Sequence, residues 1–255
     1  HNLMLSDRSL KLATQGVALV HNLICGSLVS VGIGTDNGAP IIPSPRYTPY
    51  HVHHGTQIAG FMTILHGDMK FYNNIFIQKK IRSCMKALSE LMGSDGNMWD
   101  NCNMITGTSP YDEYPTFEQW KKNFEGYCGM GSDVGDLYYE HLPVWASGNC
   151  YFNGARPWKK ESDAISDTEN TVSISLEQKD GGWYLHTNLY DFLPENTDGI
   201  ISTETLGIAF EPEQKYENPD GSPIIFNQDF SGEHRDVLTC AGPFINKESA
   251  SRKLF

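Results

Sequence analysis

An asparagine followed by apolar residues recurs along the chain, and this repeat limits the possible folds more than any other feature. In every copy the residues one and three places after the asparagine are apolar. These two positions share one face of a β-strand, because side chains alternate between the two faces. The copies are His1-Asn2-Leu3-Met4-Leu5, His21-Asn22-Leu23-Ile24-Cys25, Asn73-Asn74-Ile75-Phe76-Ile77 and Gly148-Asn149-Cys150-Tyr151-Phe152.

The first two copies lie 20 residues apart. Such a period, with one short strand and a polar corner in each repeat, is typical of a stacked β-solenoid. His1 stands where a strand should already be running, so we expect the chain to be the C-terminal part of a longer solenoid. The repeated asparagines are interpreted as structural, because stacked amides satisfy backbone groups that the turns leave free.

The pattern divides the chain into two parts of an all-β protein. Residues 1–158 carry the repeats and are predicted to form the solenoid, interrupted by a partly helical insertion at about 78–140. Residues 159–255 are predicted to form a small antiparallel β region that packs on the solenoid or caps it. Alternating apolar residues predict a hairpin over 171–187, with its turn at 180–182.

Several shorter segments carry their own expectations. The 52 residues from Asn22 to Asn74 indicate one coil with an inserted loop, or two coils, and residues 61–65 are expected to resume the solenoid. Helical spacing predicts a helix over 81–92, and Thr116 is a suitable N-cap for a second helix. In the C-terminal part we expect a linker or an exposed turn at 160–170 and short strands at 208–210 and 224–226.

The net charge of −12 argues against nucleic acids and anionic membrane surfaces as partners, since both attract clustered lysine and arginine. A neutral sugar is compatible with this charge. No stretch approaches the roughly 18 consecutive apolar residues that a membrane span requires.

The six cysteines show neither CxxC pairs nor a short metal-ligand spacing. Cys25 and Cys150 are interpreted as small buried residues at inward positions of the repeat. This usage favours a reduced, cytoplasmic protein, with export as the alternative. The cysteines are Cys25, Cys84, Cys102, Cys128, Cys150 and Cys240.

The segment 46–54 is the richest candidate site, because three of its last four residues are histidines. Three histidines so close can bind a metal, but no acidic residue lies at a recognisable ligand spacing. We therefore favour a polar cleft wall, in which Arg46, His51 and His54 donate hydrogen bonds to sugar hydroxyls. A loop held in place for structural reasons is the alternative. No metal and no cofactor are expected.

Asp7 and Asp68 are the carboxylates nearest the repeats, and a glycosidase needs two carboxylates. Nothing in the sequence places these two face to face, and Asp68 after His66-Gly67 suits a turn. Asp68 is kept as a candidate for substrate binding, and no catalytic residue is assigned.

The stretch 15–76 resembles glycoside hydrolases built on a right-handed parallel β-helix, and most of all the family-120 β-xylosidases. Similar segments follow downstream at 148–149, 154–155 and 221–224, and His53 stands where the family pattern has proline. The residues that carry the resemblance are Gln15-Gly16, Val20-His21-Asn22-Leu23, Thr48-Pro49-Tyr50-His51, His54, Thr56, Ile58-Ala59-Gly60, Gly67-Asp68 and Phe71-Tyr72-Asn73-Asn74-Ile75-Phe76.

The resemblance implies a retaining enzyme that cleaves β-xylosides or related short oligosaccharides. The family's nucleophilic aspartate and acid/base glutamate precede the segment matched by residues 2–5, so this chain alone is expected to be inactive. The implied partners are a xylo-oligosaccharide or other small glycoside, the missing N-terminal part, and a second copy of the chain.

Two rival functions fit a β-solenoid. A pectate-lyase-like enzyme needs Ca²⁺ held by clustered aspartates together with a basic residue, and only Arg46 is offered here. A non-catalytic carbohydrate-binding or structural solenoid is the alternative to the hydrolase.

Overall fold

The computed structural model describes residues 1–12, 14–30, 46–93, 104–126, 140–194, 199–210, 212–236, 240–245 and 251–255. Its regular structure is mostly β-strand with a few short helices, as predicted for an all-β protein. Among the described residues, no helix combines the length and the apolar character needed to cross a bilayer.

The asparagine repeats form one parallel sheet, here called the first ladder. Its order is β1 (Leu3–Met4), β4 (Leu23–Ile24), β9 (Ile75–Ile77), β11 (Cys150–Phe152) and β12 (Ile165–Asp167). The copies align in register, because Leu3 pairs with Leu23, Leu23 with Ile75, and Ile75 with Cys150. The first ladder also continues through β12, inside the segment expected to be a linker or an exposed turn.

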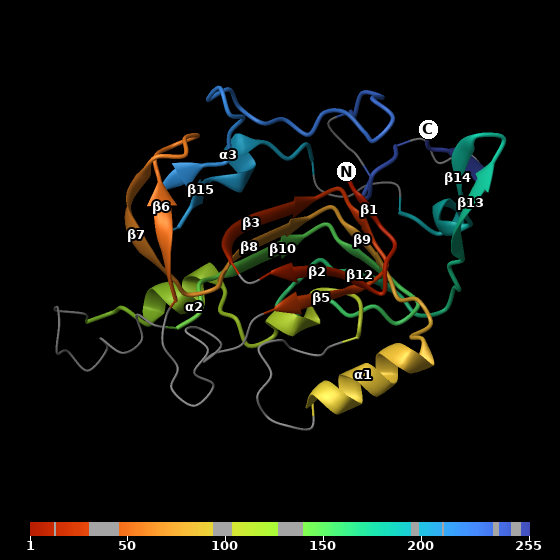
Figure 1. Ribbon diagram of the computed structural model, residues 1–255, viewed down its shortest axis with the longest axis horizontal. Helices are drawn as coiled ribbons and strands as arrows, with labels where there is room; N and C mark the ends of the chain where they lie inside the picture. Colours follow the sequence, from red (N-terminus) through yellow and green to blue (C-terminus); the bar gives the residue numbers. More distant parts are fainter. Residues whose placement is uncertain are drawn as a thin grey trace.

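Two further parallel ladders lie beside the first (Figure 1). The second contains β3 (Gln15–Val20), β8 (Gly67–Tyr72) and β10 (Val144–Ser147). The third contains β2 (Arg8–Leu12) and β5 (Ser27–Ser30), and single bridges extend it from Ser27 to Gly107 and on to Arg156. The chain therefore visits the three ladders in the same order three times. Since β4 pairs directly with β9, the 52-residue interval is one turn with an inserted loop.

Both faces of the first ladder are buried, but by different parts of the molecule. Ile24, Phe76 and Tyr151, two places after each asparagine, pack with residues of the other two ladders. Cys25, three places after Asn22, and Cys150, one place after Asn149, lie on the opposite face. The prediction that they occupy inward positions is therefore wrong. The repeat is apolar on both faces and does not reveal which one is enclosed. The C-terminal residues that cover these cysteines are Val172, Leu185, Leu189, Tyr190, Leu193, Cys240, Ala241 and Phe244.

The inserted loop carries an antiparallel hairpin of β6 (Arg46–His51) and β7 (Ile58–Ile64). The prediction that residues 61–65 resume the solenoid is therefore wrong, and the ladders resume at β8. The hairpin stands at one end of the ladders (Figure 1). In the next insertion lie α1 (Ser83–Gly93), a 3₁₀ turn at Ser109–Tyr111 and α2 (Phe117–Lys122). Thr116 caps α2 as predicted, in a capping box with Gln119.

The C-terminal part contains the predicted hairpin, β13 (Ile174–Lys179) and β14 (Gly182–Thr187), to which β17 (Ser251–Lys253) adds a third strand. A 3₁₀ turn at Leu189–Asp191, helix α3 (Thr203–Leu206) and the pair β15 (Ile208–Ala209) and β16 (Gln214–Lys215) follow in the chain. The strand predicted at 224–226 is reduced to a single bridge between Ser202 and Ile225.

A buried arginine holds the C-terminal segment together. Arg235 donates to the carbonyl oxygens of Gln228, Cys240 and Gly242, at 3.3, 3.3 and 2.7 Å. His21 is buried close by, and burial followed by the charge of Arg235 lowers its pKa to about 2. His21 is therefore neutral in the folded protein.

Candidate functional site

The repeated asparagines form a buried ladder of amides, as predicted. Asn22 donates its side-chain amide to Asn74 Oδ1 at 2.8 Å, and Asn74 donates to Asn149 Oδ1 at 3.0 Å. Each Oδ1 also accepts the backbone N–H of the preceding asparagine, at 3.0 and 2.9 Å. Asn2 continues the ladder at its exposed end, where it donates to Asn22 Oδ1 at 2.9 Å. These amides satisfy one another and serve the fold.

A buried carboxylate ends this ladder. Glu161 accepts from Asn149 Nδ2 at 2.8 Å and from the Tyr151 hydroxyl at 2.6 Å. Burial raises the pKa of Glu161 to about 7, although both hydrogen bonds favour the charged form. With 8% of its surface exposed, Glu161 is a structural group.

Asp68, a candidate for substrate binding, is also buried and has partners for both oxygens. Its Oδ1 accepts from Lys70 Nζ, and its Oδ2 accepts from the backbone N–H of Phe210 at 2.8 Å. Lys70 Nζ lies 4.4 Å from the ring centre of Trp145 and 4.9 Å from that of Tyr216. Burial raises the pKa of Asp68 and lowers that of Lys70, and their contact opposes both shifts. With 1% exposed, Asp68 ties the second ladder to the C-terminal part.

The other carboxylate considered, Asp7, accepts from Arg82 Nε. Asp7 and Asp68 therefore have separate partners, and these contacts give no support to an acid/base pair.

The histidine turn, residues 51–57, connects β6 to β7. It is closed by the Val52 N–H donating to the Gln57 carbonyl, and by the Gly55 N–H donating to the Val52 carbonyl, both at 2.9 Å. The His51 ring contacts the Thr56 carbonyl through Nδ1 at 3.1 Å. Of the three candidates in this segment, Arg46 lies in β6 opposite Ile64, His51 ends the strand, and His54 lies in the turn.

Glu217 joins the histidines from 164 residues away and is the residue that sequence reasoning missed. Its Oε2 lies 3.1 Å from His53 Nε2 and 3.8 Å from His54 Nε2. A second contact, Gln214 Nε2 donating to the Tyr50 hydroxyl at 2.8 Å, binds the same two segments. No local spacing could reveal this acidic partner, because tertiary folding alone brings it close.

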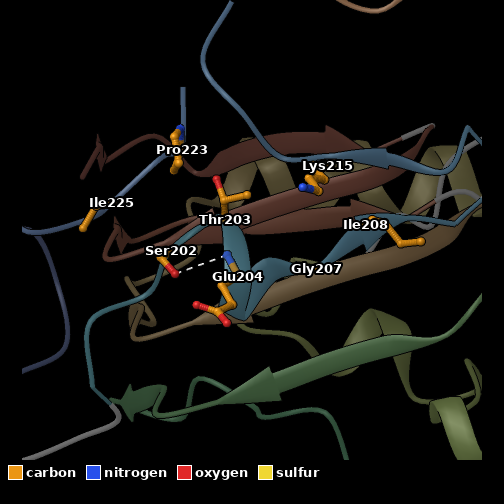
Figure 2. A pocket seen from close by; sticks show the side chains of 8 residues that line it. All are labelled: Ser202, Thr203, Glu204, Gly207, Ile208, Lys215, Pro223 and Ile225. Atoms are coloured by element: carbon orange, nitrogen blue, oxygen red, sulfur yellow. Dashed lines mark hydrogen bonds between the residues drawn. The ribbon is translucent and has the colours of Figure 1, made fainter. Parts of the chain in front are cut away.

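A hollow of about 500 Å³ is formed by residues of α3, β15, β16 and the segment that follows β16. In Figure 2 the α3 residues stand between Pro223 and Ile225 on one side and Lys215 and Ile208 on the other. Pro223 pairs with Glu217 through a single β-bridge. The segment 217–225 therefore both lines the hollow and carries the acidic partner of the histidine turn. Its lining combines an apolar wall with charged and hydroxyl groups, a composition suited to a small polar ligand. The lining residues are Ser202, Thr203, Glu204, Gly207, Ile208, Lys215, Pro223 and Ile225.

Comparison with solved structures shows what this arrangement is similar to. The whole chain matches part of a structure described as the complex of XylC with xylose, with a TM-score of 0.76 and 27% sequence identity. The chain spans 35% of the length of that XylC chain. No protein-family model and no curated protein matches the sequence. The fold of these residues is thus the fold of one portion of XylC.

Proposed function

We propose that this chain is the C-terminal portion of a retaining glycoside hydrolase that acts on β-xylosides or related short oligosaccharides. The observation that carries the proposal is the likeness of the whole chain to part of XylC, whose structure holds xylose. The three parallel ladders support stacked parallel coils. We propose that these are the last coils of a right-handed parallel β-helix of the family-120 type. The net charge of −12 is also compatible with a neutral sugar.

The chemistry of retention requires two carboxylates about 5–5.5 Å apart, one as nucleophile and the other first as acid and then as base. Asp68 and Glu161 are both buried and used by the fold. We assign the catalytic pair to the portion of a XylC-like protein that this chain does not match. This chain would supply the scaffold and one wall of the sugar pocket.

The wall is assigned to the β6–β7 hairpin. Arg46 and His51 lie at the ends of β6, and an arginine and an imidazole are both suitable donors to sugar hydroxyls. His54 would contribute its backbone and the edge of its ring to the wall, because its Nε2 faces Glu217. The hollow provides room for a sugar residue.

The first test is His51→Ala in a complete XylC-like protein that contains these residues. We expect kcat/KM for an aryl β-xyloside to fall about tenfold, the value of one hydrogen bond of roughly 1.4 kcal/mol. The melting temperature should stay within about one degree, because His51 is exposed. His186→Ala, which removes an exposed histidine paired with Glu177, is the control. Unchanged kcat/KM would remove His51 from the sugar wall.

The second test uses the 255-residue chain by itself. We expect no turnover of an aryl β-xyloside, because a retaining glycosidase loses most of its rate without either carboxylate. Calorimetric titration with xylobiose should still detect weak binding. Saturable hydrolysis by the purified chain would overturn the assignment of the carboxylates. Absence of both activity and sugar binding, in the chain and in the complete protein, would overturn the hydrolase proposal.

A further inference from the structure

Within the described residues, His53, His54 and Glu217 are the one group of three metal-ligand side chains found together. Their ligand atoms all lie within 4.8 Å of one another. A tetrahedral zinc ion with bonds of roughly 2.0–2.2 Å places its ligand atoms about 3.4 Å apart. The two measured separations from Glu217 Oε2, 3.1 and 3.8 Å, lie on either side of that value.

An ordinary histidine–glutamate ion pair explains only half of this arrangement. The contact of His53 with Glu217 has hydrogen-bond length, but His54 Nε2 at 3.8 Å is too far for one. The two imidazole rings also lie with their centres 3.7 Å apart, where two protonated rings would repel each other. A single cation bound by His53 Nε2, His54 Nε2 and the Glu217 carboxylate would explain why these three groups lie so close together.

The backbone presents these groups from two constrained turns. His54 has a positive φ of 51°, which turns it back toward the same side as His53 within the closed histidine turn. Glu217 is fixed by its bridge to Pro223, and the adjacent Asn218 N–H donates to the Ser222 carbonyl at 2.9 Å. The ligands are therefore positioned by the turns that carry them.

The exposure of the three side chains suits a site that is open on one side. Glu217 is 16% exposed, whereas His53 and His54 are 44% and 23% exposed. The carboxylate would lie beneath the ion, and a water molecule would complete the coordination from solvent. Asp220 lies near His54, but its Oδ1 already accepts hydrogen bonds from the Ser222 N–H and hydroxyl.

We propose that His53, His54 and Glu217 bind one zinc ion, which fastens the β6–β7 hairpin to the segment that follows β16. Two imidazoles and one carboxylate are ligands typical of zinc and related transition metals, whereas Ca²⁺ and Mg²⁺ prefer oxygen ligands throughout. The site is independent of the catalytic carboxylates, and its role is to hold the hairpin in place.

The test is zinc titration of the untagged protein by calorimetry, with elemental analysis after dialysis. We expect one zinc ion per chain and a rise in melting temperature with zinc. Glu217→Gln and the double variant His53→Ala/His54→Ala should each weaken binding by at least about 100-fold, because losing a ligand should cost no less than the 10–100-fold loss that follows removal of a ligand's hydrogen-bond partner. Both should also abolish the rise in melting temperature.

His186→Ala is the matched control, because His186 forms a similar exposed pair with Glu177 at 2.9 Å but belongs to no group of three metal-ligand side chains among the described residues. It should bind zinc as the parent does. Cobalt substitution gives an independent readout, since a tetrahedral site produces intense visible bands that Glu217→Gln should lose. Zinc binding that is equal in the parent and in both ligand variants, or absent from the parent, would overturn the proposal. None of these measurements depends on xylosidase activity.

Discussion

The asparagine ladder and the histidine turn both bring together polar side chains from distant parts of the sequence, yet they differ in burial and in the contacts of each polar atom. In the ladder, Asn22, Asn74 and Asn149 are buried, and their amides bind one another and the backbone. In the histidine turn, two imidazoles converge on Glu217 at the surface. A buried polar cluster whose hydrogen bonds are all made within the protein supports the fold. A cluster whose polar atoms meet at the surface is suited to binding a ligand.

The largest effect is expected from breaking the ladder at its centre. Asn74→Leu removes the partners of the Asn22 N–H, the Asn22 amide and the Leu19 carbonyl, so it should lower the free energy of unfolding by about 3–5 kcal/mol. Asn22→Leu should cost about 1–3 kcal/mol, and Asn2→Leu, at the exposed end, less than about 1 kcal/mol. Urea unfolding measures the series.

The order of the series is the decisive outcome. Equal losses at Asn2, Asn22 and Asn74 would contradict a ladder whose members depend on one another. Lost xylobiose binding with an unchanged melting temperature in Asn22→Leu would show that the ladder contacts the ligand.

A smaller effect is expected from Glu161, where the ladder ends. Its folded-state pKa of about 7 lies above its ordinary value of 4.5, so the folded protein keeps a proton that the unfolded chain has released. The contribution of Glu161 to stability is therefore fully present below pH 4.5 and is lost as the pH rises through 7. The change is roughly 3 kcal/mol.

Glu161→Gln should remove this pH dependence, because the amide is always neutral. The depressed pKa of His21 acts in the opposite direction, so the quantity to measure is the difference between variant and parent across pH 4–8. We expect the variant to gain stability relative to the parent as the pH rises. A constant difference would show that folding does not raise the pKa of Glu161.

The smallest effect is expected at the histidine turn in the absence of metal. His53→Ala/His54→Ala removes an exposed ion pair, and such pairs contribute less than about 1 kcal/mol. Chemical unfolding in the presence of a chelator should therefore give nearly the same free energy for variant and parent. A loss as large as that of Asn74→Leu would abolish the contrast between the two clusters, since the turn would then be structural as well.

The chain matches 35% of a XylC chain whose structure contains xylose. The hairpin, the hollow and Glu217 all lie outside the three ladders. The ladders themselves present side chains that are mostly buried.

The sequence by itself determined the parallel stacking, the amide ladder and the capped helix at Thr116. Each of these depends on a local pattern or on a repeat in register, in which the same residue types meet at every turn of the chain. It also predicted the C-terminal hairpin, whose turn residues Asp180 and Gly181 both have the positive φ required by a two-residue turn.

Only the tertiary structure decided which face of the first ladder is enclosed and which residues meet outside it. The repeat is apolar on both faces, so its alternation does not show that Cys25 and Cys150 face the C-terminal part. Asp68 looked available for a sugar until its burial against Lys70 was known. Glu217 reaches the histidines across 164 residues, because long-range packing places two loops together without leaving a periodic mark in the sequence.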